Sequence, residues 1–538
     1  MRERNPFILA DLIRIRADEK PDLDVLTFEH MSLDGGATPD EVRTYADLQI
    51  RANRIAAELI ARAMAPGDRF AIMMRNHPEF VEAMIAASIT GCVFVPIDPR
   101  TRGEKLAFLL SNSESRGIFC ADYCAQEIVA IRDSCPKLEW ILCLESGESE
   151  VPTPMDLPDL LPLAEVLDRD AESVDSRVDD VSAPLQIIYT SGTTGDPKGI
   201  VGDHMRMGGT GMLGGIFGYQ EDERPYTGLS FTHNNAQATA LAPALMSGYR
   251  AVLSRRFTKS KLWDVCRRYG CTSFSLVGGM ATAIYSEPRR DDDADNPVRL
   301  VVSGGMPLAI WAAFEERFGV DIFEFYGASD GGGMAYNPPG EGPKGSFGKP
   351  MSSVRMAILD AEGNECPADE VGEICCRPAD GSEASVEYHG NPQASRKKIQ
   401  AGWNRSGDMG HRDAEGFFYF DYRIGGGIRH NGDFVNPSFV EKVVAEAEQI
   451  TDAFVYGVPA ASGAPGEKDV VAAVVPRDPG LFNAEDLFAH CRKGLEPNFV
   501  PGFFQVVEEI PKTASEKPQE RLLEDRFERR LDPIHSRG

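Results

Sequence analysis

The sequence predicts a multidomain α/β protein. From Tyr45 onward, segments with apolar residues at helical spacing alternate with short apolar runs, and a second alternating series extends from residue 251 to residue 302. Strands that alternate with helices form parallel βαβ units. From Gly345 the pattern changes to strand-like runs separated by turn residues, which is typical of antiparallel strands. We therefore expect a large N-terminal domain of βαβ subdomains with a small β-barrel-like part, followed by a small, mobile α+β C-terminal domain.

The N-terminal domain is expected to contain two βαβ series. The first comprises a helix at residues 45–64, a strand at 69–74, a helix at 78–90, a strand at 93–97, a helix at 106–111 and a strand at 117–120. The second comprises a strand at 252–257, a helix at 261–270 and a strand at 272–277. Residues 146–182 are acidic and rich in proline, which indicates a surface connection.

The C-terminal part has its own expected elements. Residues 373–377 and 417–421 resemble antiparallel strands with residues 413–416 as the turn, residues 438–476 look βαβ-like, and residues 484–495 look helical. The three consecutive glycines at 425–427 fit a flexible joint, because glycine hardly restricts backbone rotation. We therefore place a domain boundary at Arg423, between residues 1–422 and 423–538.

Composition excludes several classes of protein. The 538 residues are too many for one small domain, and 42% apolar with 26% charged residues is an ordinary globular balance. With 56 basic and 83 acidic residues the net charge is −27. Such a chain repels phosphate backbones at long range, which argues against nucleic-acid binding.

Cysteine and hydropathy patterns favour a cytoplasmic protein. The eleven cysteines show no paired metal-binding spacing and are expected to be reduced thiols that act as small apolar residues. Charged residues interrupt the apolar stretch of the first twenty residues, so we expect no signal peptide. The most apolar stretch, residues 84–97, is too short to span a bilayer.

The loop at residues 187–199, IIYTSGTTGDPKG, carries the strongest chemical signal. An apolar strand ends at Tyr189, and the small residues that follow can point several backbone N–H groups at one anion. The hydroxyl groups add donors and a lysine adds positive charge, although the GxxxxGK[ST] pattern of a Walker A loop does not fit here. We expect a phosphate cradle formed by Thr190, Ser191, Gly192, Thr193, Thr194, Gly195 and Lys198.

This loop resembles the signature of the acyl-adenylate-forming superfamily, which includes the acyl-CoA synthetases, the firefly luciferases and the nonribosomal adenylation domains. Further motifs similar to that family's follow in order: GGMP at 304–307, YGASD at 326–330, SGD at 406–408, GDFVNPSFVE at 432–441, GAPGE at 463–467 and PKTASEK at 511–517. The resemblance covers about residues 45–521 and lies loosely nearest the carnitine/crotonobetaine-CoA ligase branch.

The resemblance implies a role for each matching residue. The ring of Tyr326 would stack on adenine, Ser329 would hold the α-phosphate, and Asp330 would bind Mg²⁺. Asp408 would accept hydrogen bonds from the ribose hydroxyls, and Arg423 would reach the ribose and phosphate. The other implied nucleotide-binding residues are Gly304, Gly305, Gly327, Ala328 and Gly432.

Lys517 is the implied catalytic lysine. Together with Thr190, Lys198 and Mg²⁺ it would offset the charge that builds up when a carboxylate attacks the α-phosphate of ATP. Glu516 stands where the family usually has glycine, and a glutamate does not easily adopt a positive φ. Gly425 stands at the hinge position, where Asp or Lys is common. We still expect Lys517 to be catalytic.

His233 is the candidate residue for the acid side of the site. It aligns with a family histidine that commonly gates the carboxylate pocket or the pantetheine tunnel. The polar residues 234–237 and the glycines 331–333 would lie near that pocket, which suggests a roomy site for something other than a plain alkyl chain. The GxGxxG pattern at residues 209–214 follows no apolar strand, so we expect helix packing there instead of dinucleotide binding.

We therefore predict an ATP- and Mg²⁺-dependent acyl-CoA synthetase that converts a carboxylic acid to acyl-AMP, releases pyrophosphate and transfers the acyl group to coenzyme A. The sequence leaves open whether two copies form a homodimer. One alternative is adenylation with transfer to a carrier-protein thiol, or adenylation alone. A comparison of free coenzyme A with a carrier protein as the acceptor distinguishes this alternative from the synthetase. Another, motivated by Glu516 and Asp330, is a non-catalytic nucleotide-binding protein of the same fold, which would give no pyrophosphate exchange.

Overall fold

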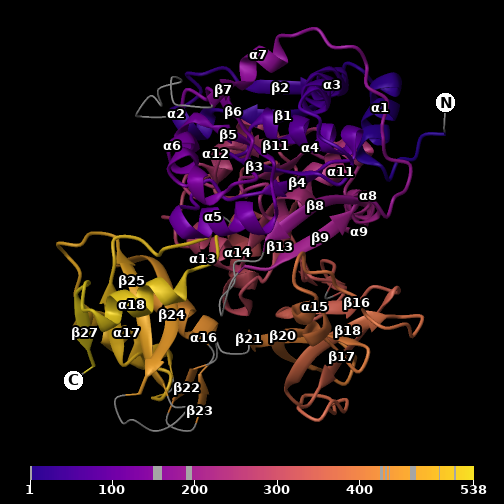
Figure 1. Ribbon diagram of the computed structural model, residues 1–538. Helices are drawn as coiled ribbons and strands as arrows, with labels where there is room; N and C mark the ends of the chain where they lie inside the picture. Colours follow the sequence, from indigo (N-terminus) through magenta and orange to yellow (C-terminus); the bar gives the residue numbers. More distant parts are fainter. Residues whose placement is uncertain are drawn as a thin grey trace. The chain divides into compact units, whose positions relative to one another are not determined.

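The computed structural model describes residues 3–148, 160–189, 197–331, 333–423, 428–430, 433–435, 437–460, 468–495, 497–513 and 516–537 (Figure 1). The chain divides into two compact units within a mixed α/β fold, and the division falls inside one strand. Unit 1 comprises Met1–Ser275 with Val386–Lys397, and unit 2 comprises Leu276–Ser385 with Lys398–Gly538.

Unit 1 contains the first predicted βαβ series as a seven-stranded sheet, in the order β7-β6-β5-β3-β4-β8-β9. All neighbours pair in parallel except β8 and β9, which form an antiparallel pair. The strands are β3 (Arg69–Met73), β4 (Val93–Pro96), β5 (Gly117–Ala121), β6 (Trp140–Leu144), β7 (Leu160–Pro162), β8 (Pro184–Tyr189) and β9 (Gly199–Asp203).

Capping residues mark the ends of the first two helices of this series. Thr44 and Asp47 form a capping box at the start of the first helix, and Gly91, with φ of 75°, ends the second. Every residue of that second helix is buried, which explains its nearly continuous apolar sequence. The helices are α3 (Tyr45–Ala61), α4 (Pro78–Thr90), α5 (Gly103–Asn112), α6 (Asp122–Ala130) and α7 (Leu163–Leu167).

The second series also forms a sheet in unit 1. Strand β11 (Ala251–Ser254) pairs in parallel with β1 (Asp24–Glu29) and β10 (Pro225–Thr227), while β2 (Glu41–Thr44) is antiparallel to β1 and β12 (Ser273–Val277) is parallel to β10. The remaining helices are α1 (Leu9–Glu19), α2 (Met31–Asp34), α8 (His204–Gly211), α9 (Leu213–Ile216), α10 (Asn234–Ala236), α11 (Ala242–Ser247), α12 (Leu262–Tyr269) and α15 (Pro392–Lys398), the last of which ends at the unit boundary.

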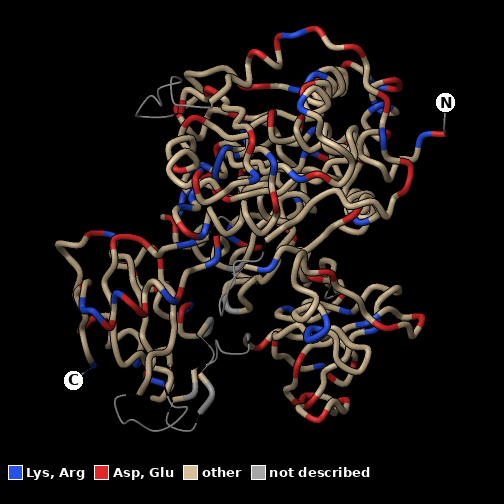
Figure 2. The backbone as a smooth tube through the Cα atoms, in the orientation of Figure 1, with Lys and Arg blue, Asp and Glu red and all other residues tan. Residues whose placement is uncertain are grey.

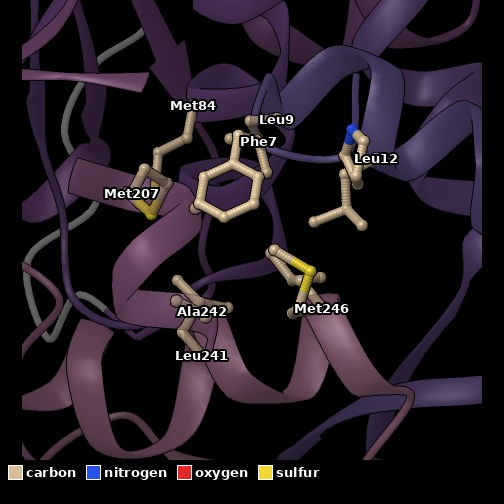
Figure 3. A pocket seen from close by; sticks show the side chains of 12 residues that line it. Phe7, Leu9, Leu12, Met84, Met207, Leu241, Ala242 and Met246 are labelled. Carbon is tan, nitrogen blue, oxygen red and sulfur yellow. The ribbon is translucent and has the colours of Figure 1, made fainter. Parts of the chain in front are cut away.

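Two of the three glycines of the GxGxxG pattern, Gly211 and Gly214, serve helix packing, as predicted. A side chain at Gly211 would lie 2.8 Å from Met246, and one at Gly214 would lie 2.9 Å from Tyr249. Beside them is an apolar cavity of about 10 Å³, where Phe7 faces residues of α8 and α11 (Figure 3). That volume is about one water molecule, so the cavity cannot hold an organic acid.

Unit 2 begins with a parallel strand pair and continues antiparallel. β13 (Leu300–Gly304) and β14 (Asp321–Gly327) are parallel, and each later neighbour in the order β14-β15-β16-β21-β20-β18-β17 is antiparallel. The other elements are α13 (Gly278–Tyr285), α14 (Leu308–Phe318), β15 (Met334–Asn337), β16 (Ser346–Pro350), β17 (Val354–Leu359), β18 (Gly372–Pro378), β19 (Ile399–Gln400), β20 (Trp403–Arg412) and β21 (Phe418–Arg423).

Strand β20 is one of several strands of this sheet that were not predicted. The turn at 413–416 joins β21 to β20, and β18 pairs with β20, so the two strands predicted from sequence are not direct neighbours. The sequence of β20, WNRSGDMGHR, contains two glycines and four charged or basic residues, and it lacks the apolar alternation that marks a strand.

The C-terminal part of unit 2 holds a four-stranded sheet in the order β24-β25-β26-β27. The predicted βαβ pattern at 438–476 is wrong, because β24 and β25 are antiparallel and their short connection has no room for a crossover helix. The βαβ unit instead consists of β25, α17 and β26. The elements are β22 (Ile428–His430), β23 (Asp433–Val435), α16 (Pro437–Ala445), β24 (Ile450–Pro459), β25 (Lys468–Pro476), α17 (Ala484–Gly494), β26 (Phe503–Val506), α18 (Glu520–Glu528) and β27 (Ile534–Ser536).

The structure also bears on the cysteines, the hydropathy and the charge distribution of the chain. All eleven cysteines are described, and each is a buried free thiol. Among the described residues, no helix is both long and apolar enough to cross a bilayer. Figure 2 shows basic residues interspersed with acidic ones along the chain in both units.

Candidate nucleotide and acid site

The predicted phosphate loop lies between two paired strands of unit 1. β8 ends at Tyr189 and β9 begins at Gly199, and these two residues are paired in the antiparallel register. The strand pair therefore fixes both ends of the loop. Lys198 is exposed, with its Nζ 5.3 Å from the centre of the Tyr388 ring. The cradle residues Thr190, Ser191, Gly192, Thr193, Thr194 and Gly195 lie outside the described residues.

His233 also belongs to unit 1. It is partly buried and precedes the short helix α10, where its Nδ1 accepts the backbone N–H of Asn235 at 3.4 Å. Gln237 is buried, and its side-chain amide donates to the Phe231 carbonyl at 2.7 Å. That glutamine therefore shapes the turn before His233, and its donor is used within the protein.

In unit 2, the predicted adenine loop is held by a residue that the sequence analysis missed. Gly304 ends β13, and the N–H groups of Gly305 and Met306 donate to the two carboxylate oxygens of Glu324 on β14, at 2.5 and 2.9 Å. Glu324 is only 4% exposed, and burial raises its pKa to about 7. The polar residue inside the otherwise apolar segment DIFEFYG was the available signal.

The predicted adenine and ribose residues are in direct contact. The Tyr326 hydroxyl donates to Asp408 Oδ2 at 2.7 Å, and the ring stacks on Phe347 at 4.6 Å between centroids. Burial and the nearby carboxylate raise the pKa of Tyr326 well above its usual value, so the hydroxyl keeps its proton and acts as the donor. This hydrogen bond orients the Asp408 carboxylate. A carboxylate has two acceptor oxygens, which suits it to bind the two ribose hydroxyls.

A second glutamate holds the SGD segment. Glu373 on β18 accepts the backbone N–H of Gly407 at 2.8 Å and the Arg405 Nε–H at 2.6 Å. Gly407 has φ of 80°, a conformation that favours glycine, and it directly precedes Asp408. Glu373 is another residue that sequence reasoning missed, because its partners lie on a neighbouring strand, β20, that was not predicted.

The candidate metal ligand Asp330 is paired with a lysine. Its Oδ2 lies 2.7 Å from Lys398 Nζ, and both side chains are largely buried. The backbone carbonyl of Asp330 accepts the side-chain amide of the buried Asn404 at 2.8 Å. Among the described residues, no group of three or more His, Cys, Asp or Glu side chains could hold a metal ion. Asp330 is therefore the carboxylate at the predicted metal position. Its negative charge is already compensated by Lys398.

The glycines that follow Asp330 do not simply open space for a substrate. Gly331 and Gly333 have φ of 83° and 73°. A side chain at Gly333 would lie 2.7 Å from Val354 and 3.2 Å from Cys376. Backbone conformation and packing therefore require this glycine, which is a different reason from the roomy pocket expected from the sequence.

The lysine loop, residues 511–517, contains one residue with a strained backbone. The N–H of Thr513 donates to the Lys517 carbonyl at 2.8 Å, and the N–H of Lys517 donates to the Thr513 hydroxyl at 3.2 Å. Glu516 has φ of 57°, so this glutamate does adopt the left-handed conformation that the family's glycine would adopt easily. The Lys517 side chain is exposed, and the Glu516 carbonyl lies beside Gly279 of α13.

The remaining predicted residues are placed as follows. Arg423 ends β21 and pairs with Asp408 in the strand register, which brings their backbones together. Gly327 ends β14, and Ala328 and Ser329 follow it in the loop before Asp330. Gly432 and the expected hinge at 425–427 lie outside the described residues.

The chain matches known protein families over most of its length. Residues 13–381 match the AMP-binding enzyme family, and residues 440–517 match the AMP-binding enzyme C-terminal domain. The chain belongs to the AMP-binding enzyme family. The superfamily resemblance found in the sequence motifs is confirmed.

Relatives and solved structures agree with this assignment. The chain is 28% identical to a crotonobetaine/carnitine–CoA ligase of Citrobacter koseri, covering 88% of this chain and 91% of the relative. It is also 28% identical to a sulfoacetate–CoA ligase of Cupriavidus necator, covering 95% and 96%. In fold, this AMP-binding enzyme is similar to an anthranilate CoA ligase in complex with anthranoyl-AMP, with a TM-score of 0.82 at 22% identity over 97% and 98% of the two chains. A benzoate CoA ligase from Burkholderia xenovorans gives a TM-score of 0.78 at 21% identity over 96% and 99%.

Proposed function

We propose that this AMP-binding enzyme is an acid–CoA ligase. It activates a carboxylic acid with ATP, forms an acyl-AMP with release of pyrophosphate, and transfers the acyl group to coenzyme A. The contact between Tyr326 and Asp408, next to the loop held by Glu324, carries this proposal. It supplies an aromatic face from β14 and a ribose acceptor from β20, two strands of one sheet, as an adenine nucleotide requires.

The reaction proceeds in two balanced steps. A carboxylate oxygen of the acid attacks the α-phosphorus, and the bond from that phosphorus to the pyrophosphate oxygen breaks. The coenzyme A thiol then loses its proton and its sulfur attacks the acyl carbon, and AMP leaves. The first step brings together two negative groups, so positive charge at the site lowers its barrier. Lys198 and Lys517 are the proposed sources of that charge within the protein.

Asp330 is the residue that would hold Mg²⁺. A carboxylate oxygen is a suitable ligand, and Mg²⁺ commonly binds through one or two carboxylates together with substrate phosphates. When bound, the ion would neutralise phosphate charge. Because Lys398 lies 2.7 Å from Asp330, any cation at this carboxylate competes with the lysine.

This competition can be measured without turnover. We expect Lys398→Met to tighten Mn²⁺ binding, detected by electron paramagnetic resonance, by about fivefold, since a compensating charge is lost. Asp330→Asn should weaken it. Unchanged Mn²⁺ affinity in both variants would show that Asp330 is not the metal ligand.

The proposed domain arrangement follows the family. We propose that residues 423–538 form the mobile C-terminal domain, with the glycines at 425–427 as its joint, and that Lys517 is presented to the nucleotide for the adenylation step only. The family match to residues 440–517 supports a distinct C-terminal domain. The three glycines support a joint because they permit large backbone rotations.

The proposed acid carries a polar or charged group in addition to its carboxylate. His233, Asn234 and Asn235 form a polar turn that would adjoin the acid. Two relatives are named for crotonobetaine or carnitine and for sulfoacetate, which are small acids with a charged second group.

Pyrophosphate exchange with a panel of acids tests the function. The panel should contain short alkyl, betaine-like, sulfonated and aromatic acids, followed by AMP release with coenzyme A added. Exchange with one class and coenzyme A-dependent AMP release would support the ligase and name its substrate class. Exchange without that release would favour a carrier protein as acceptor or an adenylate-only enzyme. Nucleotide binding without exchange for any acid would favour the non-catalytic alternative.

A further inference from the structure

Glu324 connects two backbone N–H groups of the predicted adenine loop to the strand that carries Tyr326. Each carboxylate oxygen accepts one N–H, from Gly305 at 2.5 Å and from Met306 at 2.9 Å. Gly305 has φ of 107°, a conformation that residues with side chains rarely adopt. The shape of the loop after β13 therefore depends on a bidentate acceptor at position 324.

The same strand positions the ribose side of the site. Glu324 and Tyr326 are two residues apart on β14, so they point to the same face of the sheet. Tyr326 in turn holds Asp408 through its hydroxyl. A single strand thus fixes the loop at the base and the carboxylate at the ribose.

No cation is among the groups that set the pKa of Glu324. Burial raises the pKa to about 7, while the hydrogen bonds from the backbone N–H groups of Met306 and Gly305 lower it. None of these groups carries a charge. The loop is therefore held by a carboxylate that gains or loses its proton near neutral pH.

We propose that Glu324 is a positioning residue for the nucleotide: its ionised carboxylate holds residues 304–307 in the shape that receives adenine, and its protonation weakens nucleotide binding. A protonated carboxyl group has one hydroxyl oxygen, which is a poor acceptor for the second N–H. One N–H of the loop then loses its partner, and the loop is free to change shape. This inference rests on the nucleotide site of the proposed function, but it requires neither the acid nor coenzyme A.

The experiment measures the dissociation constant of AMP by calorimetry between pH 6 and pH 8.5. It compares the wild type with Glu324→Gln and with the matched control Glu441→Gln. Glu441 on α16 is another glutamate that accepts a backbone N–H, from Val455 at 2.9 Å, and its pKa is also raised to about 7 by burial and nearby acids.

At pH 8.5 we expect Glu324→Gln to bind AMP about tenfold more weakly than the wild type. That corresponds to one hydrogen bond to a charged group, at roughly 1.4 kcal/mol for each tenfold change. At pH 6 the ratio should approach one, because the wild-type carboxyl is then protonated too. The ratio also cancels the titration of the AMP phosphate itself. Glu441→Gln should give a ratio near one at every pH.

Two results would overturn the inference: equal AMP affinity of Glu324→Gln and wild type at pH 8.5, or a ratio that does not change with pH. If Glu324→Gln does not fold, adenosine binding to the wild type decides, because adenosine does not ionise in this range. Its affinity should fall about fivefold from pH 8.5 to pH 6, and a flat profile would contradict the proposal. Failure of the wild type to bind AMP at all would instead count against the proposed function.

Discussion

The nucleotide-side loops and the lysine loop of unit 2 each contain a residue with a positive φ, but the residue type differs. Gly305 and Gly407, in the loops at 304–307 and 406–408, take positive φ as glycines, and Glu324 and Glu373 hold these loops by hydrogen bonds to backbone N–H groups. The loop at 511–517 reaches positive φ at Glu516, a residue that adopts it at a cost. The nucleotide side is thus shaped before a ligand binds, while the lysine side stores strain.

The largest expected effect separates the two regions by function. Lys517→Ala should lower the rate of ATP–pyrophosphate exchange by on the order of 10²–10³, as expected when a group that stabilises developing charge is lost. Its AMP affinity should stay within about twofold, because the loops at 304–307 and 406–408 are untouched. The control is Lys493→Ala, at an exposed lysine of α17. Equal exchange rates in both variants would remove Lys517 from the chemistry.

The next effect concerns pH and the Glu324 side alone. Because burial raises the folded-state pKa of Glu324 from 4.5 to about 7, the folded state keeps a proton that the unfolded state has already lost in this range. The contribution to the free energy of unfolding is therefore fully present below pH 4.5 and is lost as the pH rises to about 7. The loss should be about 3 kcal/mol. Thermal unfolding of the wild type and Glu324→Gln across pH 5–8 should show a smaller pH slope in the variant, and parallel curves would argue against it.

Much of this arrangement could be predicted from the sequence, for a physical reason. Tyr326, Asp408 and Gly305 lie in short local motifs whose residue types are set by the ligand chemistry and by a positive φ. Glu324 and Glu373 were missed because their role depends on which strands are neighbours, and β20 carries too little apolar alternation to be recognised. The antiparallel pairing of β24 and β25 was also missed, because the sequences of two apolar strands do not reveal their relative direction.

A smaller effect tests the second glutamate that holds a nucleotide-side loop. Glu373→Gln should lower the free energy of unfolding by about 2 kcal/mol, because Arg405, whose side chain is 18% exposed, loses its charged partner. Glu324→Gln, measured at the same pH, leaves no cation without its partner. Chemical denaturation followed by tryptophan fluorescence would measure both. A loss below about 0.5 kcal/mol would show that the ion pair is no stronger than an ordinary surface pair.

The smallest expected effect lies in the lysine loop. Glu516→Gly removes the strain of a left-handed non-glycine residue, about 1 kcal/mol, but it also raises the backbone entropy of the unfolded chain by a comparable amount. The net stabilisation should therefore be less than about 1 kcal/mol. Ala63→Gly is the matched control, because Ala63 in unit 1 has a nearly identical φ of 54°. Both variants should shift the unfolding midpoint by similar small amounts, but only Glu516→Gly should change pyrophosphate exchange. We expect that rate to rise about two- to threefold, because a negative charge next to Lys517 is removed. A slower exchange would show instead that the Glu516 side chain helps to place the lysine.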